Sequence, residues 1–168
     1  KGDTGIFGEL EKSIEEEGGE VRVAQKGDTI SFGDGVELRV LYPTHVVASD
    51  TNDGSVSIVV TYGEHSFLLT GDLSQELESE LIIDTLPKNI TVYKAGHHGS
   101  RTSSGEVLLS RIHPEYSVIS AGNNDYGHPH LETLERLQKY GREVLSTIDH
   151  GAITFLSDGR TLEVKTEK

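Results

Sequence analysis

Three short polar motifs, each directly after an apolar run, constrain the fold of this chain more than any other feature. They are residues 70–72 (TGD), 94–100 (KAGHHGS) and 126–130 (YGHPH). Each motif combines glycine, which lets the backbone turn, with a carboxylate or imidazole side chain. In folds that alternate strands and helices, ligands gather in loops at strand ends. The spacing therefore predicts three loops side by side at one sheet edge, where they can form a metal site.

The remaining pattern predicts hairpins in the first third of the chain and strand-helix alternation afterwards. This combination is typical of an α/β fold, with a mixed sheet and flanking helices, in a single domain. The predicted helices cover 5–17, 74–86, 105–112 and 131–140, and the predicted strands cover 21–23, 29–32, 36–40, 55–62, 65–70, 90–95, 116–120, 143–148, 152–156 and 161–165.

The amino-acid composition limits the ligands and binding partners that this chain can have. The 168 residues include no Cys and eight His, so disulfides and thiolate metal sites are excluded and any metal would take nitrogen and oxygen ligands. A net charge of -13 counts against simple DNA binding, although a bound divalent ion can reverse the local field. The apolar runs are strand-sized, so the sequence predicts no membrane span.

Asp72 comes directly after residues 67–71 (FLLTG), at the end of an apolar strand. It can serve as an oxygen ligand that bridges two divalent ions. It can also be an acid interacting with the positive end of the following helix, which, for an Asp considered alone, is the more common use.

His97 and His98 are adjacent, so they leave a strand in different directions. Both can reach one metal cluster only if the backbone turns, and Gly96 and Gly99 allow that turn. The alternatives are one ligand with one outer or substrate-facing partner, or two surface loop residues. Lys94, one strand step earlier, can also face the site.

Pro129 fixes the directions of His128 and His130. We expect His128 to contact substrate or metal and His130 to satisfy backbone groups before the helix at 131. The polar run 100–104 can hold a phosphate through its hydroxyls and Arg101, or can be an ordinary loop. We interpret four further histidines, His45, His65, His113 and His150, as surface or packing residues.

Together, LLTGD at 68–72, KAGHHGS at 94–100 and GNNDYGHPH at 122–130 resemble the C-terminal half of a metallo-β-lactamase-fold domain. The nearest type is the one appended to the DNA-uptake channel ComEC. The resemblance implies an αβ/βα sandwich and a hydrolase in which one or two divalent ions, zinc or manganese, activate water against a phosphoester. It implies DNA as the substrate, with one strand degraded during uptake.

The resemblance also implies the site residues. Asp72 matches the acid that bridges the metals, the His97-His98 pair matches the last metal-ligand motif, with His98 preferred, and His128 matches a position near the substrate. Asn52 stands where many relatives carry a further ligand, and an Asn there suggests weaker binding of one ion.

The signature His-x-His-x-Asp-His of the family is absent from the chain. We therefore expect residues 1–168 to form the second half of a domain, with the missing N-terminal half as its first partner. Half a site should hold metal poorly, so the chain alone is expected to be inactive and largely metal-free. The exposed edge left by the missing half would favour a homodimer.

Two alternatives stay open. One is a hydrolase of the same fold that acts on a small ester or phosphoester, which the acidic charge favours. The other is a non-catalytic module of a DNA-uptake channel. If the chain belongs to such a channel, the channel region of the same polypeptide is a further partner, and the domain lies on the extracytoplasmic side of the membrane.

Overall fold

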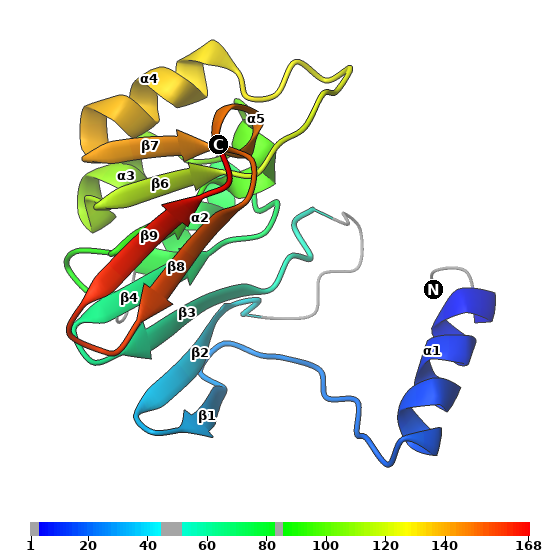
Figure 1. The fold of residues 1–168 in the computed structure, drawn as a ribbon. Helices are drawn as coiled ribbons and strands as arrows, with labels where there is room; N and C mark the ends of the chain where they lie inside the picture. Colours follow the sequence, from blue (N-terminus) through cyan, green and yellow to red (C-terminus); the bar gives the residue numbers. More distant parts are fainter. Residues whose placement is uncertain (1–3, 45–51, 83–85) are drawn as a thin grey trace.

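The computed structural model describes residues 4–44, 52–82 and 86–168. Its centre is a seven-stranded mixed sheet in the order β1-β2-β3-β4-β5-β6-β7 (Figure 1). Strands β1 to β4 pair antiparallel as hairpins, whereas β4, β5, β6 and β7 are mutually parallel. The strands of this sheet are β1 Thr29–Gly33, β2 Val36–Tyr42, β3 Ser57–Tyr62, β4 His65–Leu69, β5 Val92–Lys94, β6 Tyr116–Ile119 and β7 Glu143–Ser146.

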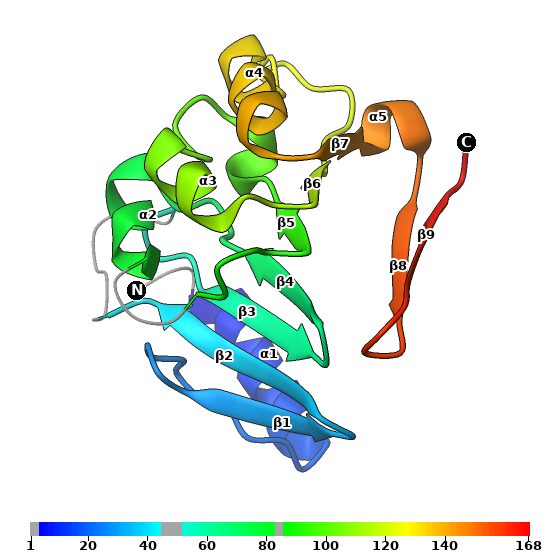
Figure 2. The ribbon, with the colours of Figure 1, turned by 90° about the vertical axis from the view of Figure 1, so that its left-hand side faces the viewer.

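Helices cover one face of the sheet and a short hairpin covers part of the other (Figure 2). The helices are α1 Thr4–Glu16, α2 Gln75–Ile82, α3 Glu106–Ile112, α4 Leu131–Tyr140 and α5 Thr147–His150, with a 3-10 turn η1 at Gly96–Gly99. Of these, α2, α3 and α4 lie against the sheet. The hairpin consists of β8 Ile153–Ser157 and β9 Leu162–Thr166, and Phe155 in β8 packs edge-on against Phe67 in β4. The α/β class with a mixed sheet and flanking helices is confirmed.

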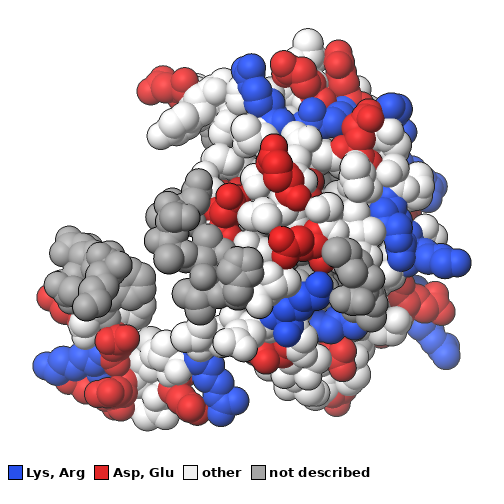
Figure 3. Space-filling model, turned by 180° about the vertical axis from the view of Figure 1, so that it is seen from behind, with Lys and Arg blue, Asp and Glu red and all other residues white. Residues whose placement is uncertain are grey.

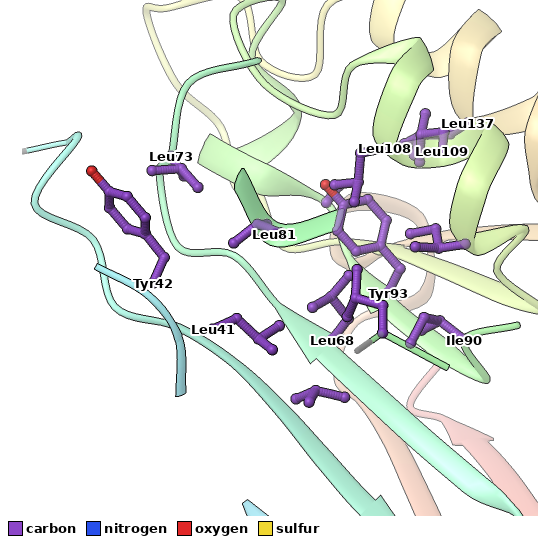
Figure 4. Close-up of a cluster of buried hydrophobic side chains, with 14 of the residues drawn as sticks. Leu41, Tyr42, Leu68, Leu73, Leu81, Ile90, Tyr93, Leu108, Leu109 and Leu137 are labelled. Atoms are coloured by element: carbon purple, nitrogen blue, oxygen red, sulfur yellow. The ribbon is translucent and has the colours of Figure 1, made fainter. Parts of the chain in front are cut away.

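The hydrophobic core fills the space between the sheet and helices α2, α3 and α4 (Figure 4). Leu68 in β4 and Tyr93 in β5 point into it from the sheet, and Leu108, Ile112 and Leu137 close it from the helices; all five are fully buried. This burial is the main source of stability because removing apolar surface from water is the dominant favourable term in folding. The same core packing holds in place the strands that end at the three polar motifs.

The N-terminal part is much less buried. Helix α1 stands away from the sheet (Figure 1), and every residue of the edge strand β1 is exposed, including Phe32 at 66%. Of the described residues, no helix has the length and apolar character needed to cross a bilayer.

Most predicted elements are present, and two were predicted wrongly. Residues 21–23 form no strand, and their two valines are exposed, so they lack the burial that a strand pattern implies. The strand predicted over 143–148 ends at Ser146, whose side chain accepts the amide of Ile148 and starts the short helix α5. Residues 83–85, at the end of the helix predicted over 74–86, lie outside the described residues.

Candidate metal centre

The three polar motifs meet at one edge of the sheet. They follow β4, β5 and β6, and these strands are parallel neighbours, so their carboxyl ends lie side by side. Backbone bonds join the loops: the His97 amide donates to the Gly71 carbonyl at 3.1 Å, and the His130 amide donates to the Gly99 carbonyl at 3.0 Å. A Cβ on Gly99 would lie 2.7 Å from Cβ of Pro129, so glycine is needed for this contact. The predicted juxtaposition of the motifs is present.

Asp72 is positioned by a tight turn at Gly71. Gly71 has φ +64, and a Cβ there would lie 2.8 Å from the Cβ of Ser55. The Ser55 hydroxyl in turn accepts the Asp72 amide at 3.0 Å. Asp72, Asn52 and His97 line one cavity of about 430 Å³. The structure therefore brings three of the predicted site residues to one space.

The turn at the histidine pair involves the histidines as well as a glycine. His97 (φ 48, ψ 47) and His98 (φ 56, ψ 24) are both left-handed, and Gly99 follows with φ 84, so the expectation that glycine allows the turn holds for Gly99. Such a conformation costs on the order of 1–3 kcal/mol per non-glycine residue, and residues held in it cluster at functional sites. The consequence is that the two rings diverge, with centroids 6.5 Å apart.

His98 has a fixed ring orientation. Its Nδ1 lies 2.7 Å from the carbonyl oxygen of Ser120, which only accepts, so Nδ1 carries the proton. In the neutral imidazole with this tautomer, Nε2 carries the free lone pair. Metal-binding histidines commonly show this arrangement. His98 does not line the Asp72 cavity; it lines a second, neighbouring pocket with His128 and Tyr126.

His128 lines the second pocket and lies next to His97, which lines the first. Its ring centroid lies 5.4 Å from that of His97 and 4.9 Å from that of His130. Burial lowers the pKa of His128, and the neighbouring imidazoles His130, His97 and His98 lower it further, while the Asp72 carboxylate opposes them. His128 is thus favoured as a neutral imidazole, which can accept or donate a hydrogen bond.

Lys94 lies at the end of β5 and is partly buried. Burial lowers its pKa, and the Asp72 carboxylate acts in the opposite direction. The Asp72 carboxylate therefore interacts electrostatically with Lys94, as expected if both side chains face the same end of the sheet.

A buried polar network that the sequence did not reveal supports the loop after β5, residues 96–105, which we call the histidine loop. Glu78 in α2, only 1% exposed, accepts the amide of Ser104 at 2.6 Å with Oε1 and that of Gly105 at 2.7 Å with Oε2. The Ser104 hydroxyl lies 2.9 Å from the Tyr93 hydroxyl and accepts the Gly96 amide at 3.1 Å. A chain of hydrogen bonds thus runs from a buried carboxylate to the residue before His97.

The same loop is held from two further sides. The Ser103 hydroxyl donates to the Leu73 carbonyl at 2.8 Å, next to Asp72. The Arg136 guanidinium donates to the carbonyls of Ser103 and Ser104, each at 3.0 Å. Ser103 and Ser104 are buried, so their hydroxyls stabilise the loop and are not available to a phosphate. Arg101, by contrast, is exposed and lines the Asp72 cavity.

Glu78 could have been noticed in the sequence. Leu77, Leu81 and Ile82 pack on or in the core from one face of α2, and Glu78 lies on that face. A carboxylate within an apolar helical stripe must find partners, because burying an unpaired charge is costly. Burial raises the pKa of Glu78 to about 7, although the Gly105 and Ser104 amides and the Arg136 charge oppose it.

The other histidines fulfil backbone or packing roles. His130 Nδ1 accepts the Arg101 amide at 3.2 Å, as expected for a backbone-satisfying residue. His65 bonds the Ser157 hydroxyl at 2.7 Å, and His150 bonds the Ser146 backbone. His113 ends α3 in a left-handed conformation and lines a separate cavity of about 520 Å³ at the opposite sheet edge. His45 lies outside the described residues.

The side chains at this edge are of the types that bind divalent ions, but among the described residues too few of them lie together for a complete site. Asp72 offers a carboxylate and His97 an imidazole, which are ordinary ligands of zinc and manganese. Within residues 4–44, 52–82 and 86–168, however, no three His, Asp or Glu side chains converge on one point. A structural or catalytic zinc site takes at least three protein ligands. Among the described residues, the Asp72 cavity thus offers fewer carboxylate and imidazole ligands than a zinc site takes.

The fold is that of a known protein superfamily. Residues 8–123 match the model of the metallo-β-lactamase superfamily, which is more than half of the chain. The chain therefore belongs to the metallo-β-lactamase superfamily.

Within this superfamily the chain is related to bacterial competence proteins. It is 35% identical to the ComE operon protein 3 of Bacillus subtilis over 146 residues, 39% identical to the recombination protein 2 of Haemophilus influenzae over 120 residues, and 37% identical to the competence protein ComA of Neisseria gonorrhoeae over 125 residues. These matches cover 86%, 71% and 73% of this chain but only 19%, 15% and 18% of the three relatives. The chain thus spans less than a fifth of each relative's length.

A solved structure was also found, that of a proposed metal-dependent hydrolase from Parabacteroides distasonis. It matches with a TM-score of 0.47 and 14% identity over 81% of this chain and 61% of that one. A likeness of this size adds nothing to the argument on function.

Proposed function

We propose that this chain is part of a metal-dependent phosphodiesterase domain that cleaves DNA during uptake. The observation that carries the proposal is the convergence of Asp72 and His97 on one cavity at the carboxyl edge of the sheet, next to His98 and His128. Membership of the metallo-β-lactamase superfamily and the names of the relatives, a competence protein and a recombination protein among them, support the reaction class and the substrate.

Asp72 and His97 would hold the ion in this proposal, with the Asn52 amide as a weaker oxygen donor in the same cavity. A divalent ion would lower the pKa of a bound water and neutralise charge on the phosphoester. The earlier preference for His98 as the ligand came from the resemblance. We propose His97 instead, because it shares the cavity with Asp72, whereas His98 faces the neighbouring pocket.

His128 is proposed to contact the substrate. As a neutral imidazole it can hydrogen-bond a phosphate or leaving-group oxygen and exchange a proton with it. Lys94 and the exposed Arg101 would supply positive charge beside the carboxylates of the cavity, Asp53, Asp72 and Glu76.

The remaining ligands are proposed to come from another part of a longer polypeptide. The partial donor set supports this, since two side chains bind an ion weakly. The expected result is less than one ion per chain after dialysis of residues 1–168, and at least one in the intact protein that carries them, measured by elemental analysis. One tightly held ion per isolated chain would contradict the half-domain proposal.

The test of the reaction is turnover by the intact protein with Mn²⁺ or Zn²⁺ on single-stranded DNA. Asp72→Asn should lower kcat/KM by roughly 10³-fold, the scale on which one electrostatic group of an active site acts. The control is Asp34→Asn, the same chemical change in the remote, exposed β1-β2 turn, where Asn also tolerates the left-handed backbone. Equal activity of the two variants, or no turnover with either metal, would refute the nuclease.

A small phosphoester is the second candidate substrate, because the acidic net charge of the chain favours a small substrate over a polyanion such as DNA. The net charge is -13, and on the face shown in Figure 3 lysines and arginines are interspersed with acids. Polyanion binding usually needs a continuous basic surface. If DNA binding does not weaken with added salt while a small phosphodiester is hydrolysed, this second candidate replaces the first.

A further inference from the structure

The second pocket beside the candidate metal centre has a chemistry different from that of the first. It has a volume of about 200 Å³ and is lined mostly by carbon, from His98, Ala121, Gly122, Asn124, Tyr126 and His128. None of these six side chains is a carboxylate, whereas the Asp72 cavity includes Asp53, Asp72 and Glu76. Since pockets for drug-sized ligands measure about 300–1,000 Å³, this one suits a single ring system.

Tyr126 stands at this pocket with most of its surface in water. It is 80% exposed, the largest exposed fraction among the large hydrophobic residues whose side chains the structure describes. One face of the ring stacks on His128, with centroids 5.8 Å apart and an angle of 30° between the planes. An aromatic ring held in water contributes nothing to the core, yet it offers a flat surface on which a second ring can stack.

The loop that carries Tyr126, residues 121–130, is ordered by one side chain; we call it the tyrosine loop. Asn124 Oδ1 accepts the amides of Tyr126 at 3.1 Å and His128 at 3.0 Å. Asn124 Nδ2 donates to the carbonyls of Gly122 at 2.8 Å and His128 at 2.7 Å. All the hydrogen-bonding groups of this side chain thus fix the backbone that presents Tyr126 and His128 beside the metal centre.

The two spaces adjoin through the histidines. His97 lines the first, His98 and His128 line the second, and the rings of His97 and His128 are 5.4 Å apart. A substrate phosphate at Asp72 and His97 would place its neighbouring substituent next to Tyr126. In a nucleic acid, that substituent carries a flat, uncharged base.

We propose that the pocket formed by Tyr126, His98 and His128 binds a nucleobase next to the phosphodiester that is cleaved, with Tyr126 as the stacking residue. The proposal rests on the proposed function and narrows its substrate to nucleic acid in single-stranded form, because a base stacked on a side chain is not in a duplex stack. Stacking tolerates any base, so the pocket gives affinity without sequence preference.

Equilibrium binding tests this without turnover. The intact protein is titrated with a fluorescent single-stranded oligonucleotide and with an abasic oligonucleotide of the same length, in Mn²⁺-containing and in metal-free buffer. Tyr126→Ala should weaken binding of the base-containing strand about 5- to 150-fold, the range of base-aromatic stacking. It should leave binding of the abasic strand unchanged. Tyr126→Phe, which keeps the ring, should bind both strands as the parent does.

Two controls separate stacking from other causes. Phe32→Ala removes another exposed aromatic ring, 66% exposed, from the remote strand β1 and should change neither titration. Unchanged melting temperatures would show that Tyr126→Ala leaves the fold intact. An equal loss for both strands, a Tyr126→Phe defect as large as that of Tyr126→Ala, or no loss at all would each overturn the proposal.

The outcome is independent of the nuclease test. If the protein binds single strands through Tyr126 but cleaves none, the stacking pocket stands and the hydrolase proposal fails. If it cleaves DNA and Tyr126→Ala changes neither affinity nor KM, the hydrolase stands and the pocket fails.

Discussion

The histidine loop and the tyrosine loop leave neighbouring parallel strands, yet they are stabilised in opposite ways. The histidine loop lies on a buried polar network of Glu78, Tyr93 and Ser104, and its two histidines are held in a left-handed conformation. The tyrosine loop is organised by the side chain of Asn124 and leaves Tyr126 80% exposed. Under the proposed function, the two loops would have different roles. The internally supported histidine loop would hold the metal ligand, and the exposed tyrosine loop would contact the substrate.

The sharpest test of these different roles is a comparison of His97→Ala with His98→Ala. If His97 shares an ion with Asp72, its loss should weaken Mn²⁺ binding to the intact protein more than the 10- to 100-fold typical of outer-shell changes. His98→Ala should stay within that range and should weaken binding of single-stranded DNA. Calorimetric titration of both variants with Mn²⁺ gives the comparison, and the reverse order would assign the ligand to His98.

Removing the buried support should destabilise the whole domain. Glu78→Ala leaves the amides of Ser104 and Gly105 buried without an acceptor, at a cost of about 1–3 kcal/mol each. We expect a loss of roughly 2–5 kcal/mol in the free energy of unfolding, measured by urea denaturation. Glu135→Ala, at an exposed position of α4, is the control and should change it by less than about 0.5 kcal/mol. A Glu78→Ala variant as stable as this control would show that the histidine loop does not depend on the network.

The same carboxylate should make stability depend on pH. Burial raises the pKa of Glu78 from 4.5 to about 7, so between these values the folded protein holds a proton that the unfolded chain has released. The free energy of unfolding should therefore be highest, relative to Glu78→Gln, below about pH 4.5. It should fall by on the order of 3 kcal/mol as the pH rises through about 7. Urea denaturation of both proteins at several pH values measures this difference, and parallel curves would contradict it.

The sequence predicted where the three polar motifs would meet, but not the internal geometry of the candidate site. Apolar runs followed by polar, glycine-containing motifs predicted that Asp72, the His97-His98 pair and His128 would meet at one edge, because strand order and parallel pairing follow from the strand-helix alternation. The left-handed backbone at His97 and His98 was not predictable, since local rules assign such conformations to glycine. This backbone conformation is supported by hydrogen bonds through Ser104 and Glu78. Glu78 is far from the histidines in the sequence, so a short stretch of sequence around them does not reveal this support.

The smallest expected effect concerns the tyrosine loop. Asn124→Ala removes four hydrogen bonds at a part-exposed position, so we expect a loss of only about 1 kcal/mol in the free energy of unfolding. Binding of single-stranded DNA should nevertheless weaken, because Tyr126 and His128 lose their fixed backbone, while Mn²⁺ affinity should stay unchanged. The neighbouring exposed Asn123→Ala is the matched control and should affect none of the three. If Asn124→Ala lowered Mn²⁺ affinity as well, the two loops would not act separately, and the metal centre would depend on both.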